Sequence, residues 1–568
     1  MIERGRMKLR LNLLLILVFA CRVFAMEADT CRISKKDYTD KVKGGWIGQI
    51  AGVAWGFPTE FHAMGKKIPD SYVPVWKNSM INEGFCQDDL YVEMTFLQTL
   101  DKYGFEVSLR QIGIDFANSE YGLCHANDKG RWNLRKGIAP PDCSHPKFNE
   151  HADDIDYQIE ADFSGLIAPG MPQYPIEAGE KFGRLVCYGD GVYGGQFVGA
   201  MYSLAYFEND MEKVVRKALM YIPDKSQYYE CIADVMRGFE QNPQDWRKTW
   251  EFINAKYHKS IDYRQFSCTI ANDFNIDAKI NGAYIVMGLL YGRGNFEDTI
   301  KIAMMCGQDS DCNPSNAAGI LGTSIGYKNL PEKFKQIKND EKFYYAQYNF
   351  PQLVDVSVKL AEQLVVRNGS KVEKSTDGDI WVIPQKSVKP AELEQSTNPR
   401  APIGSLFTKD EMSKIKYHNP ENLEKLPPAF AINDFAPGWQ VIDCGDYMLP
   451  GLYDQWDGHR SVLVTHPYSQ TVPCVITRDY SVPVKGKTQL HIIVGHYYMG
   501  DFDLIVKVDG KELLNKTVGA ETTVNHFLEE NIDLSNYAGK TIKIELLNKA
   551  NGWACESAYW DVIEFVCK

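Results

Sequence analysis

The sequence contains no concentrated block of basic residues. Its 62 Lys and Arg residues are outnumbered by 74 Asp and Glu residues, which gives a formal net charge of −12 at pH 7. Nucleic-acid-binding proteins carry clustered positive charge that contacts phosphates, so we do not expect nucleic acid as a partner. An uncharged or cationic ligand, or a ligand held through a metal ion, is compatible with this charge.

Motifs that define three common kinds of site are also absent. The 14 cysteines include no CxxC pair and no His/Cys cluster, so the sequence does not predict a zinc site. No glycine-rich loop is followed by Lys-Ser or Lys-Thr, which a phosphate-binding P-loop requires. His125 and His145 have no recognisable triad partners, which argues against a serine or cysteine nucleophile.

The apolar run near the N-terminus is too short to span a membrane. This run, Leu11–Ala20, follows several basic residues and matches the apolar core of a secretory signal. We expect residues 1–25 to be a signal peptide cleaved after Ala25. The alternative is lipid attachment at Cys21, because "VFAC" resembles a bacterial lipobox. Both interpretations predict an exported protein, periplasmic or on the cell surface, that contacts membrane only through the signal or a lipid anchor.

The chain is too long for one compact core, and its hydrophobic pattern changes along its length. Residues 37–369 are helical in pattern without strand–helix alternation, which predicts an all-α domain. Residues 370–437, rich in Lys, Glu, Pro and Ser, are expected to be a linker. Residues 438–568 alternate with period two, which predicts an antiparallel β-sandwich. This last region resembles the jelly-roll, galactose-binding-like modules of secreted carbohydrate enzymes, which implies carbohydrate binding.

One predicted helix carries a stripe of glycines. The segment from Lys43 to Phe57 contains glycine at every fourth position: Gly44, Gly48, Gly52 and Gly56. Residues four apart share a face of a helix, so these glycines form a bare stripe against which another backbone can pack closely. Glycine costs up to about 1 kcal/mol per residue in a helix interior, so packing has to compensate.

Two acidic pairs stand at predicted helix starts. Asp88 and Asp89 precede one apolar-periodic helix, and Asp309 and Asp311 precede another. We expect the second helix to be capped by Asn313, which leaves its aspartates in the preceding loop. If the two starts meet in space, the four carboxylates repel one another unless protons or cations neutralise them, and Mg²⁺, Mn²⁺ and Ca²⁺ prefer oxygen ligands. The alternative is two independently acidic helix starts.

The helical region contains four motifs that occur together in one protein family. They are "AGVAWGFPTEF" (Ala51–Phe61), "QDDL" (Gln87–Leu90), "DGVYGGQFVGAMYSLAY" (Asp190–Tyr206) and "GQDSDC" (Gly307–Cys312). In this order they resemble the ADP-ribosylglycohydrolase family. The resemblance implies an all-α fold with one or two divalent ions, most often Mg²⁺ or Mn²⁺, that bind ribose hydroxyls. It implies metal ligation by Asp88, Asp89, Asp309 and Asp311, and it places Glu60 beside the ribose.

The chain departs from the family pattern at three positions. Val53 replaces an aspartate of the first helix, while Gln87 and Cys312 stand where threonine ligands are expected. A glutamine carbonyl is still an oxygen donor, so Gln87 can serve as a metal ligand. The thiol of Cys312 is too soft a ligand for Mg²⁺, so this residue is either a ligand of a softer metal or a small packing residue.

The polar segment Cys124–Gly165 is dense in side chains that can recognise sugars. We interpret the three clustered aspartates within it, Asp154, Asp156 and Asp162, as a solvated face and not as extra metal ligands, and Asp162 is the one of them that we would test. The substrate contacts that we expect from this segment and from the family's glycine-bearing helix are Trp132, Asn133, Asp162, Gly194 and Gly195.

Three functions are compatible with these observations. The first is an exported, metal-dependent hydrolase of a glycosidic bond at the anomeric carbon of a ribose-like or other sugar, with Glu60 and Asp89 as catalytic residues. The second is hydrolysis of ADP-ribose from modified targets, as the family name implies. The third is a glycan-binding protein without catalysis, against which the intact aspartates argue. We favour the first, with a small molecule or a glycan as substrate.

Overall fold

The computed structural model describes residues 30–266, 273–376, 378–416, 428–445, 447–553 and 555–567. The predicted signal segment, with Cys21 and Ala25, lies outside the described residues. Among those described, no helix combines the length and the apolar composition needed to cross a membrane. The chain divides into two compact units, the first ending at Ser405 and the second comprising 135–138 and 406–568.

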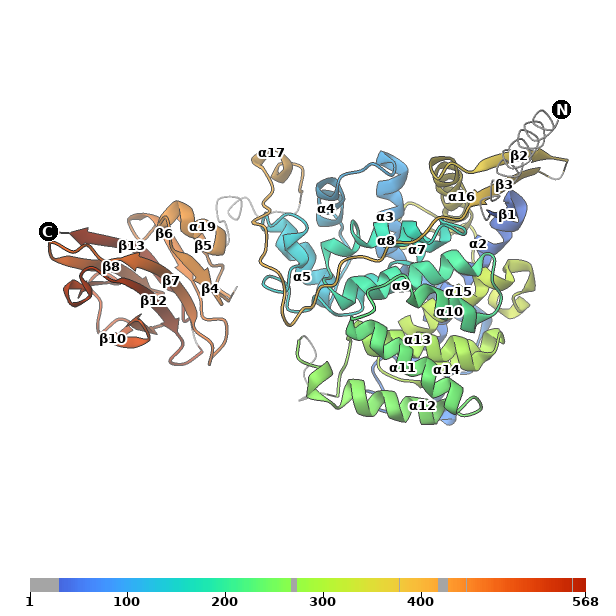
Figure 1. Cartoon of the computed structure of the whole chain (residues 1–568), viewed down its shortest axis with the longest axis horizontal. Helices are drawn as coiled ribbons and strands as arrows, with labels where there is room; N and C mark the ends of the chain where they lie inside the picture. The colour runs from blue at the N-terminus through green and yellow to red at the C-terminus, as the bar shows by residue number, and fades with distance from the viewer. Residues whose placement is uncertain are drawn as a thin grey trace, which may run out of the picture. The chain divides into compact units, whose positions relative to one another are not determined.

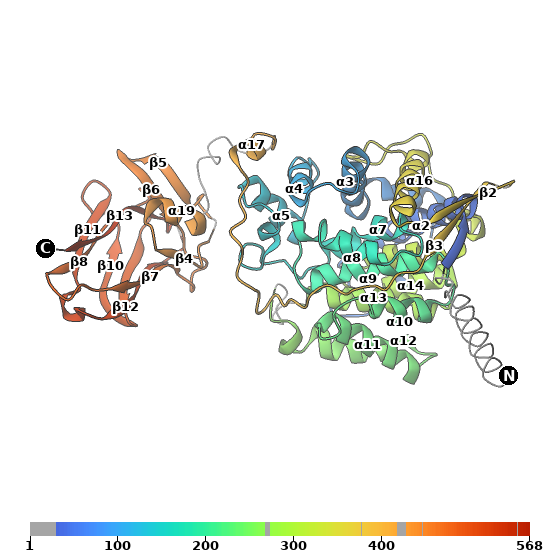
Figure 2. The same ribbon diagram turned by 45° about the horizontal axis from the view of Figure 1, so that its top comes forward.

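The first unit is built mainly of helices, which confirms the predicted all-α class (Figure 1). The central helix α9 lies beside α13 in Figure 2 and packs against both α13 and α15. The helices are α2 (Lys35–Gly56), α3 (Asp88–Tyr103), α4 (Leu109–Ala117), α5 (His125–Arg135), α6 (Asp156–Ile159), α7 (Asp162–Leu166), α8 (Gln173–Gly179), α9 (Asp190–Ala205), α10 (Met211–Leu219), α11 (Gln227–Gln241), α12 (Trp246–Ile253), α13 (Ala278–Gly292), α14 (Phe296–Met305), α15 (Cys312–Ile325) and α16 (Phe350–Arg367).

The glycine stripe of α2 brings this helix against the backbone of α15. A Cβ atom on Gly44 would overlap the carbonyl oxygen of Gly322, and one on Gly52 would overlap that of Pro314. At the end of α2, a Cβ on Gly56 would overlap Ser310. The close approach that the glycine spacing predicts is therefore observed along the stripe from Gly44 to Gly56. It positions the loop that carries Asp309 and Asp311.

The first unit also contains a small antiparallel sheet of order β1-β3-β2. Its strands are β1 (Thr30–Ser34), β2 (Lys371–Ser375) and β3 (Gly378–Pro384). Strand β3 buries Trp381, whose ring packs on Tyr38 of α2 with centroids 4.9 Å apart. The first part of the segment 370–437, which we expected to be a linker, therefore has regular structure and contributes to the core of the helical unit.

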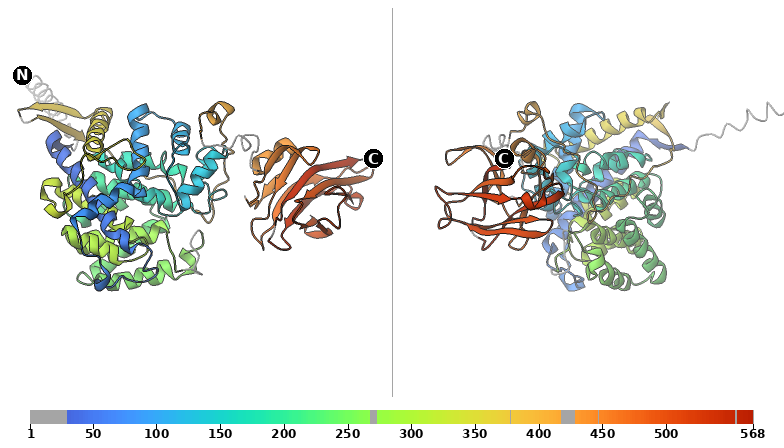
Figure 3. Two further views of the ribbon diagram at one scale, coloured as in Figure 1. Left: turned by 180° about the vertical axis from the view of Figure 1, so that it is seen from behind. Right: turned by 60° about the vertical axis from the view of Figure 1, so that its left-hand side comes forward.

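The second unit is a sandwich of two five-stranded antiparallel sheets, drawn in orange and red in Figure 3, which confirms the predicted class. One sheet has the order β10-β9-β12-β7-β4 and the other β11-β8-β13-β6-β5. The strands are β4 (Gln440–Ile442), β5 (Gly451–Trp456), β6 (His459–Thr465), β7 (Cys474–Ser481), β8 (Thr488–His496), β9 (Phe502–Val508), β10 (Lys511–Val518), β11 (Phe527–Asp533), β12 (Thr541–Lys549) and β13 (Ala558–Cys567), with helices α17 (Lys409–Met412) and α19 (Pro428–Phe435) before them.

The alternating residues of β9 show why this sandwich forms. Its side chains at Phe502, Leu504 and Val506 are fully buried in the core between the sheets, which also contains Trp560. Strand β9 turns into β10 through Asp509 and Gly510, both at positive φ. This is the backbone that a tight hairpin with matching strand twist requires.

Candidate active site

The starts of α3 and α15 lie against each other. The thiol of Cys312, the first residue of α15, donates a hydrogen bond to Oδ2 of Asp89 over 3.2 Å, although the two residues are 223 positions apart. The same sulfur lies 3.8 Å from Oδ1 of Asp311. Asp88 opens α3, with the buried Gln87 at its N-cap position. Both acidic pairs therefore meet in one cluster, called the carboxylate centre below: Asp88, Asp89, Asp309 and Asp311.

Helix α15 begins earlier than the sequence analysis predicted. Its first residue is Cys312 and its N-cap position is Asp311, so the predicted cap at Asn313 is wrong. Asn313 instead donates its amide to Oδ1 of Asn281 over 2.9 Å. Oδ1 of Asp309 accepts a hydrogen bond from the backbone N–H of Cys312 over 3.4 Å, whereas the Asp311 side chain makes no cap hydrogen bond. Helix capping therefore gives a hydrogen-bond partner to one carboxylate oxygen of Asp309 and to neither carboxylate oxygen of Asp311.

The carboxylate centre concentrates negative charge at a place where Asp89, Asp309 and Asp311 are buried and Asp88 is partly exposed. Burial raises the pKa of Asp309 to about 7 and also raises that of Asp88. The pKa values of Asp89 and Asp311 lie well above their ordinary range, because repulsion from neighbouring carboxylates adds to burial. Without a cation, these groups have to retain protons near neutral pH.

The donor atoms of the centre fit a divalent cation. Oδ1 of Asp89 is buried without a hydrogen-bond partner among the described residues, and such an orphan needs an explanation. Donor atoms of Asp309, Asp311 and Cys312 lie within 4.8 Å of one another. An oxygen-rich set favours Mg²⁺, Mn²⁺ or Ca²⁺, and the carbonyl of Gln87 can extend it. The pKa of the Cys312 thiol is held well above its usual range by burial and by the surrounding carboxylates, so this group is a hydrogen-bond donor to Asp89.

Glu60 adds a proton-binding group next to the centre. It follows a short 3₁₀ helix, Phe57–Thr59, at the end of α2 and is half-buried. Burial and the charges of Asp311 and Asp88 raise its pKa to about 8. The hydroxyls of Thr59 and Ser310 lie 2.8 Å apart and tie this turn to the loop that carries Asp309 and Asp311. The sequence analysis missed both hydroxyls, since neither residue type is distinctive by itself.

Asp162 lies in the interior behind the carboxylate centre, not among open substrate contacts. It is fully buried, and its two oxygens accept hydrogen bonds from Tyr202 and Asn316 over 2.8 Å each. Its charge helps to raise the pKa values of Asp89 and Glu93. Glu93, which the sequence analysis also missed, was recognisable from its place one helical turn after Asp89, where it shares a face of α3.

The aspartates that we interpreted as a solvated face are buried. Asp154 is 0% exposed, and Asp156 accepts a hydrogen bond from the backbone N–H of Asn127 over 2.9 Å. Burial and the charge of Asp154 raise the pKa of Asp156 to about 8. The pKa of Glu160 lies well above its usual range because of burial, Asp156 and, more weakly, Asp88 of the carboxylate centre. The interpretation as a solvated face is therefore wrong, and carboxylates continue inward from the centre.

The remaining expected substrate contacts divide into one exposed and three buried residues. Trp132, on α5, is 40% exposed. Asn133 is buried and donates both amide hydrogens to the backbone carbonyls of Cys143 and Phe148 over 2.8 Å each, which is a structural role. Gly194 and Gly195 lie inside α9, where an added Cβ would press on Gln158 or Tyr157. Of these expected contacts, only Trp132 presents an exposed surface to a substrate.

Comparisons with known proteins assign the helical region to a protein family. The family model described as ADP-ribosylglycohydrolase matches residues 34–369. None of the curated proteins matches the chain. A solved structure titled "ADP-ribosylglycohydrolase-related protein complex" is 12% identical, covers 58% of this chain and 99% of its own, and has a TM-score of 0.37. CBM35 from Paenibacillus barcinonensis is 12% identical, covers 24% of this chain and 96% of its own, and has a TM-score of 0.18.

The family match covers more than half of the chain and includes every residue of the carboxylate centre. It also includes Glu60 and the glycine-striped helix α2, which packs against the loop that carries Asp309 and Asp311. The chain therefore belongs to the ADP-ribosylglycohydrolase family and is a hydrolase.

Proposed function

We propose that the helical unit is a divalent-metal-dependent glycoside hydrolase that cleaves a bond at the anomeric carbon of a ribose-like or other sugar. The observation that carries this proposal is the orphaned, buried Oδ1 of Asp89 at the meeting point of two acidic helix starts. A buried carboxylate cluster of this kind costs stability unless cations or protons compensate it. Membership of a glycohydrolase family supports the same reaction class.

The metal would be held by Asp88, Asp89, Asp309 and Asp311, with Gln87 as a further oxygen donor. One or two ions, Mg²⁺ by preference, would supply positive charge that binds vicinal hydroxyls and lowers the pKa of water. Asp89 is anchored for this role by the hydrogen bond from Cys312.

Glu60 is the proton-transferring residue in this proposal. Without a bound cation, burial and the charges of Asp311 and Asp88 raise its pKa to about 8, so in the metal-free protein Glu60 holds a proton near neutral pH. A neighbouring cation favours the charged form of a carboxylate, so Glu60 can also accept a proton from attacking water. Its half-buried position leaves it accessible to a bound substrate.

The second candidate function is hydrolysis of ADP-ribosyl groups, which the family description favours. The two functions share the anomeric chemistry of ribose and differ in the leaving group and the rest of the substrate. We propose that the protein is exported, by the signal inferred for residues 1–25, and export favours an extracellular glycoside as substrate.

The deciding experiment is a panel of furanosides, pyranosides and ADP-ribosylated substrates, each assayed after chelation and after restoring Mg²⁺, Mn²⁺ or Ca²⁺. We expect turnover of one substrate class that chelation abolishes and a hard cation restores. Asp311→Asn should lose this turnover, whereas Asp298→Asn, an exposed aspartate on α14, should retain it. Turnover that persists in metal-free protein would refute the metal-dependent mechanism.

A further inference from the structure

A cluster of different composition lies on the same segment as the buried carboxylates. His151 Nδ1 is 2.9 Å from Oδ2 of Asp154, and His125 Nδ1 is 3.7 Å from the same oxygen. One donor atom from each residue lies within 4.8 Å of the other two. The His125 side chain is 29% exposed and that of His151 is 33% exposed, whereas the Asp154 side chain is 0% exposed. These three residues are called the histidine cluster below.

The surrounding backbone holds the histidine cluster in position. The buried side chain of Asn149 donates to the carbonyl of Ala126 over 3.1 Å, next to His125, and its Oδ1 accepts from the backbone N–H of His151 over 3.0 Å. The backbone N–H of Asp154 donates to the carbonyl of His151 over 2.9 Å. The side-chain amide of Asn149 therefore joins the start of α5 to the loop before α6. Supporting contacts of this kind are what a preorganised ligand set needs.

The spacing of the three donors suits a tetrahedral metal ion. Zinc binds histidine nitrogen and carboxylate oxygen at about 2.0–2.2 Å, which sets neighbouring ligands about 3.3 Å apart in a tetrahedron. The two distances from Oδ2 of Asp154, 2.9 and 3.7 Å, lie on either side of this value. Both rings are partly exposed, so water can reach an ion bound here.

We propose that His125, His151 and Asp154 bind a borderline divalent ion such as Zn²⁺, as a site separate from the carboxylate centre. Two imidazoles and one carboxylate are the ligand types that Zn²⁺ accepts, whereas Mg²⁺ prefers an all-oxygen set. Burial and the neighbouring His151 lower the pKa of His125 to about 4, so its ring is neutral, as a ligand must be, at pH 7.

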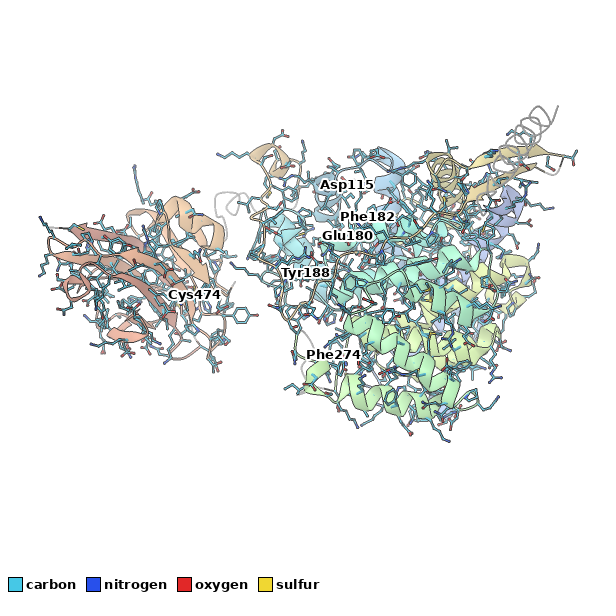
Figure 4. All side chains as sticks on the ribbon, viewed as in Figure 1. Asp115, Glu180, Phe182, Tyr188, Phe274 and Cys474 are labelled. Carbon is cyan, nitrogen blue, oxygen red and sulfur yellow. The ribbon has the colours of Figure 1, made fainter. Side chains whose placement is uncertain are left out.

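Aromatic contacts connect this second site to the segment that carries Glu60. The ring of His125 stacks on Phe274, labelled in Figure 4, with centroids 5.3 Å apart and planes 22° apart. Phe274 in turn packs on Phe61 at 5.1 Å, and Phe61 follows Glu60 directly in the chain. A row of rings therefore connects His125 to Phe61, the residue that follows the proposed proton-transferring residue Glu60.

The test is a metal titration of the tag-free full chain, stripped with chelator and then saturated with Mg²⁺ to occupy the carboxylate centre. Zn²⁺ binding is measured by calorimetry and by metal analysis after desalting, and Co²⁺ is used as a spectroscopic probe. We expect about one equivalent of Zn²⁺ and an intense visible Co²⁺ spectrum typical of four-coordination. His151→Ala should lose both signals, while His62→Gln, an exposed histidine of the same unit, should keep them.

Two further measurements separate this site from the carboxylate centre and from misfolding. Asp309→Asn should leave the Zn²⁺ equivalent unchanged, so the result does not depend on the proposed hydrolase activity. X-ray absorption of the Zn²⁺-loaded wild type should show two imidazole ligands, which requires no variant at all. A Zn²⁺ equivalent that survives in His151→Ala, an absorption spectrum without imidazole, or no Zn²⁺ binding above Mg²⁺ would each overturn the proposal.

Discussion

A thiol stands at the start of α15, where a hydroxyl would be the harder donor. Cys312 donates its hydrogen to Oδ2 of Asp89 and packs at 4% exposure between the two acidic helix starts. A thiol hydrogen bond is weak, and sulfur is a poor ligand for Mg²⁺. The geometry thus gives Cys312 a positioning role toward Asp89.

Replacing Cys312 by threonine should therefore preserve or improve Mg²⁺ binding. The hydroxyl of Cys312→Thr can donate to Asp89 and also offers an oxygen to the ion. Calorimetric titration of the metal-free protein should show an unchanged or lower dissociation constant, and Cys312→Ala should bind more weakly than either. If the threonine variant loses binding, the thiol is itself a ligand and the native metal is softer than Mg²⁺.

The raised pKa values of the carboxylates predict the pH dependence of the metal-free protein. The pKa values of Glu60, Asp309 and Asp156 are about 8, 7 and 8, whereas unfolded carboxyl groups titrate at about 4. The folded state therefore keeps protons that the unfolded state has released. This contribution to stability is complete below about pH 4 and is lost as the pH rises through 7 to 8.

Two histidines change the folding stability with pH in the opposite direction, but over a lower pH range. His125 and His258 have pKa values lowered to about 4, so their contribution grows with pH and is complete above about 6.5. In chelator, the melting temperature should therefore fall between pH 6.5 and 9. Saturating Mg²⁺ should reduce this fall, because the cation replaces the protons. A melting temperature in chelator that is constant or rises over this interval would contradict the charge distribution described here.

At the scale of single residues, the sequence predicts the four aspartates of the carboxylate centre. It does not predict the further buried carboxylates, Asp156 and Glu160. Asp88, Asp89, Asp309 and Asp311 are recognisable because they occur in pairs at helix starts within a family motif. Asp156 and Glu160 have no such context, since a carboxylate in a polar segment is more often solvated than buried. His151 was missed because its partner His125 is far away in the sequence and no metal-ligand spacing connects them.

At the scale of single elements, the contact between α2 and α15 places the loop that carries Asp309 and Asp311. Gly44 meets the far end of α15 at Gly322, while Gly56 meets Ser310 and Asp311 beside the carboxylate centre. A side chain at either position would push the two backbones apart. Only the position near the loop would also move Asp309 and Asp311, the proposed metal ligands.

Alanine substitutions along the stripe should separate stability from metal binding. Gly44→Ala and Gly56→Ala should each lower the free energy of unfolding by about 1–3 kcal/mol, as overpacking does. Only Gly56→Ala should also weaken Mg²⁺ binding, by tenfold or more in titration. Gly122→Ala, where an added Cβ meets nothing within 4 Å, is the matched control and should change neither quantity. Equal metal affinity in all three variants would show that α2 does not set the loop.

Elements with strong periodicity are predicted well, and those defined by distant pairing are not. The glycine spacing predicts α2, and the period-two pattern predicts β9 and β12. The sheet β1-β3-β2 was missed because β1 pairs with β3 about 350 residues later, as in Arg32 opposite Val382. Strand β2 is exposed along its whole length and has no alternating pattern to reveal it.

At the scale of the whole molecule, the change of hydrophobic period predicts two kinds of domain but not where the first one ends. The hydroxyl of Tyr193 donates to the carbonyl of Glu392 over 2.7 Å, and Arg184 forms an ion pair with Glu394. The backbone N–H of Ser405 donates to Asp142 over 2.7 Å. Residues up to Ser405 thus belong to the helical unit through single polar contacts, which leave no periodic pattern in the sequence.

The same contacts determine where the helical unit can be truncated. A chain ending at Ser405 retains β3 and the buried Trp381, so we expect it to keep its melting temperature within a few degrees and its Mg²⁺ affinity. A chain ending at Gly369 loses Trp381 from its packing on Tyr38. Removing a buried Trp side chain costs about 3–5 kcal/mol, so this shorter chain should be clearly less stable. Thermal unfolding of the two truncations, compared with the full chain, measures the difference.

The truncation at Ser405 also tests what the sandwich contributes to function. Beyond its core, the sandwich carries exposed rings at Tyr498 and Trp553 and a part-exposed Trp456 stacked on Tyr559 at 4.2 Å. Aromatic faces of this kind can stack on sugar rings. We expect the truncated chain to retain turnover of small soluble substrates and to lose affinity for polymeric substrate, measured as an increase in KM for the polymer alone. Loss of small-substrate turnover in a folded, Mg²⁺-binding truncation would instead show that the sandwich is required by the active site itself.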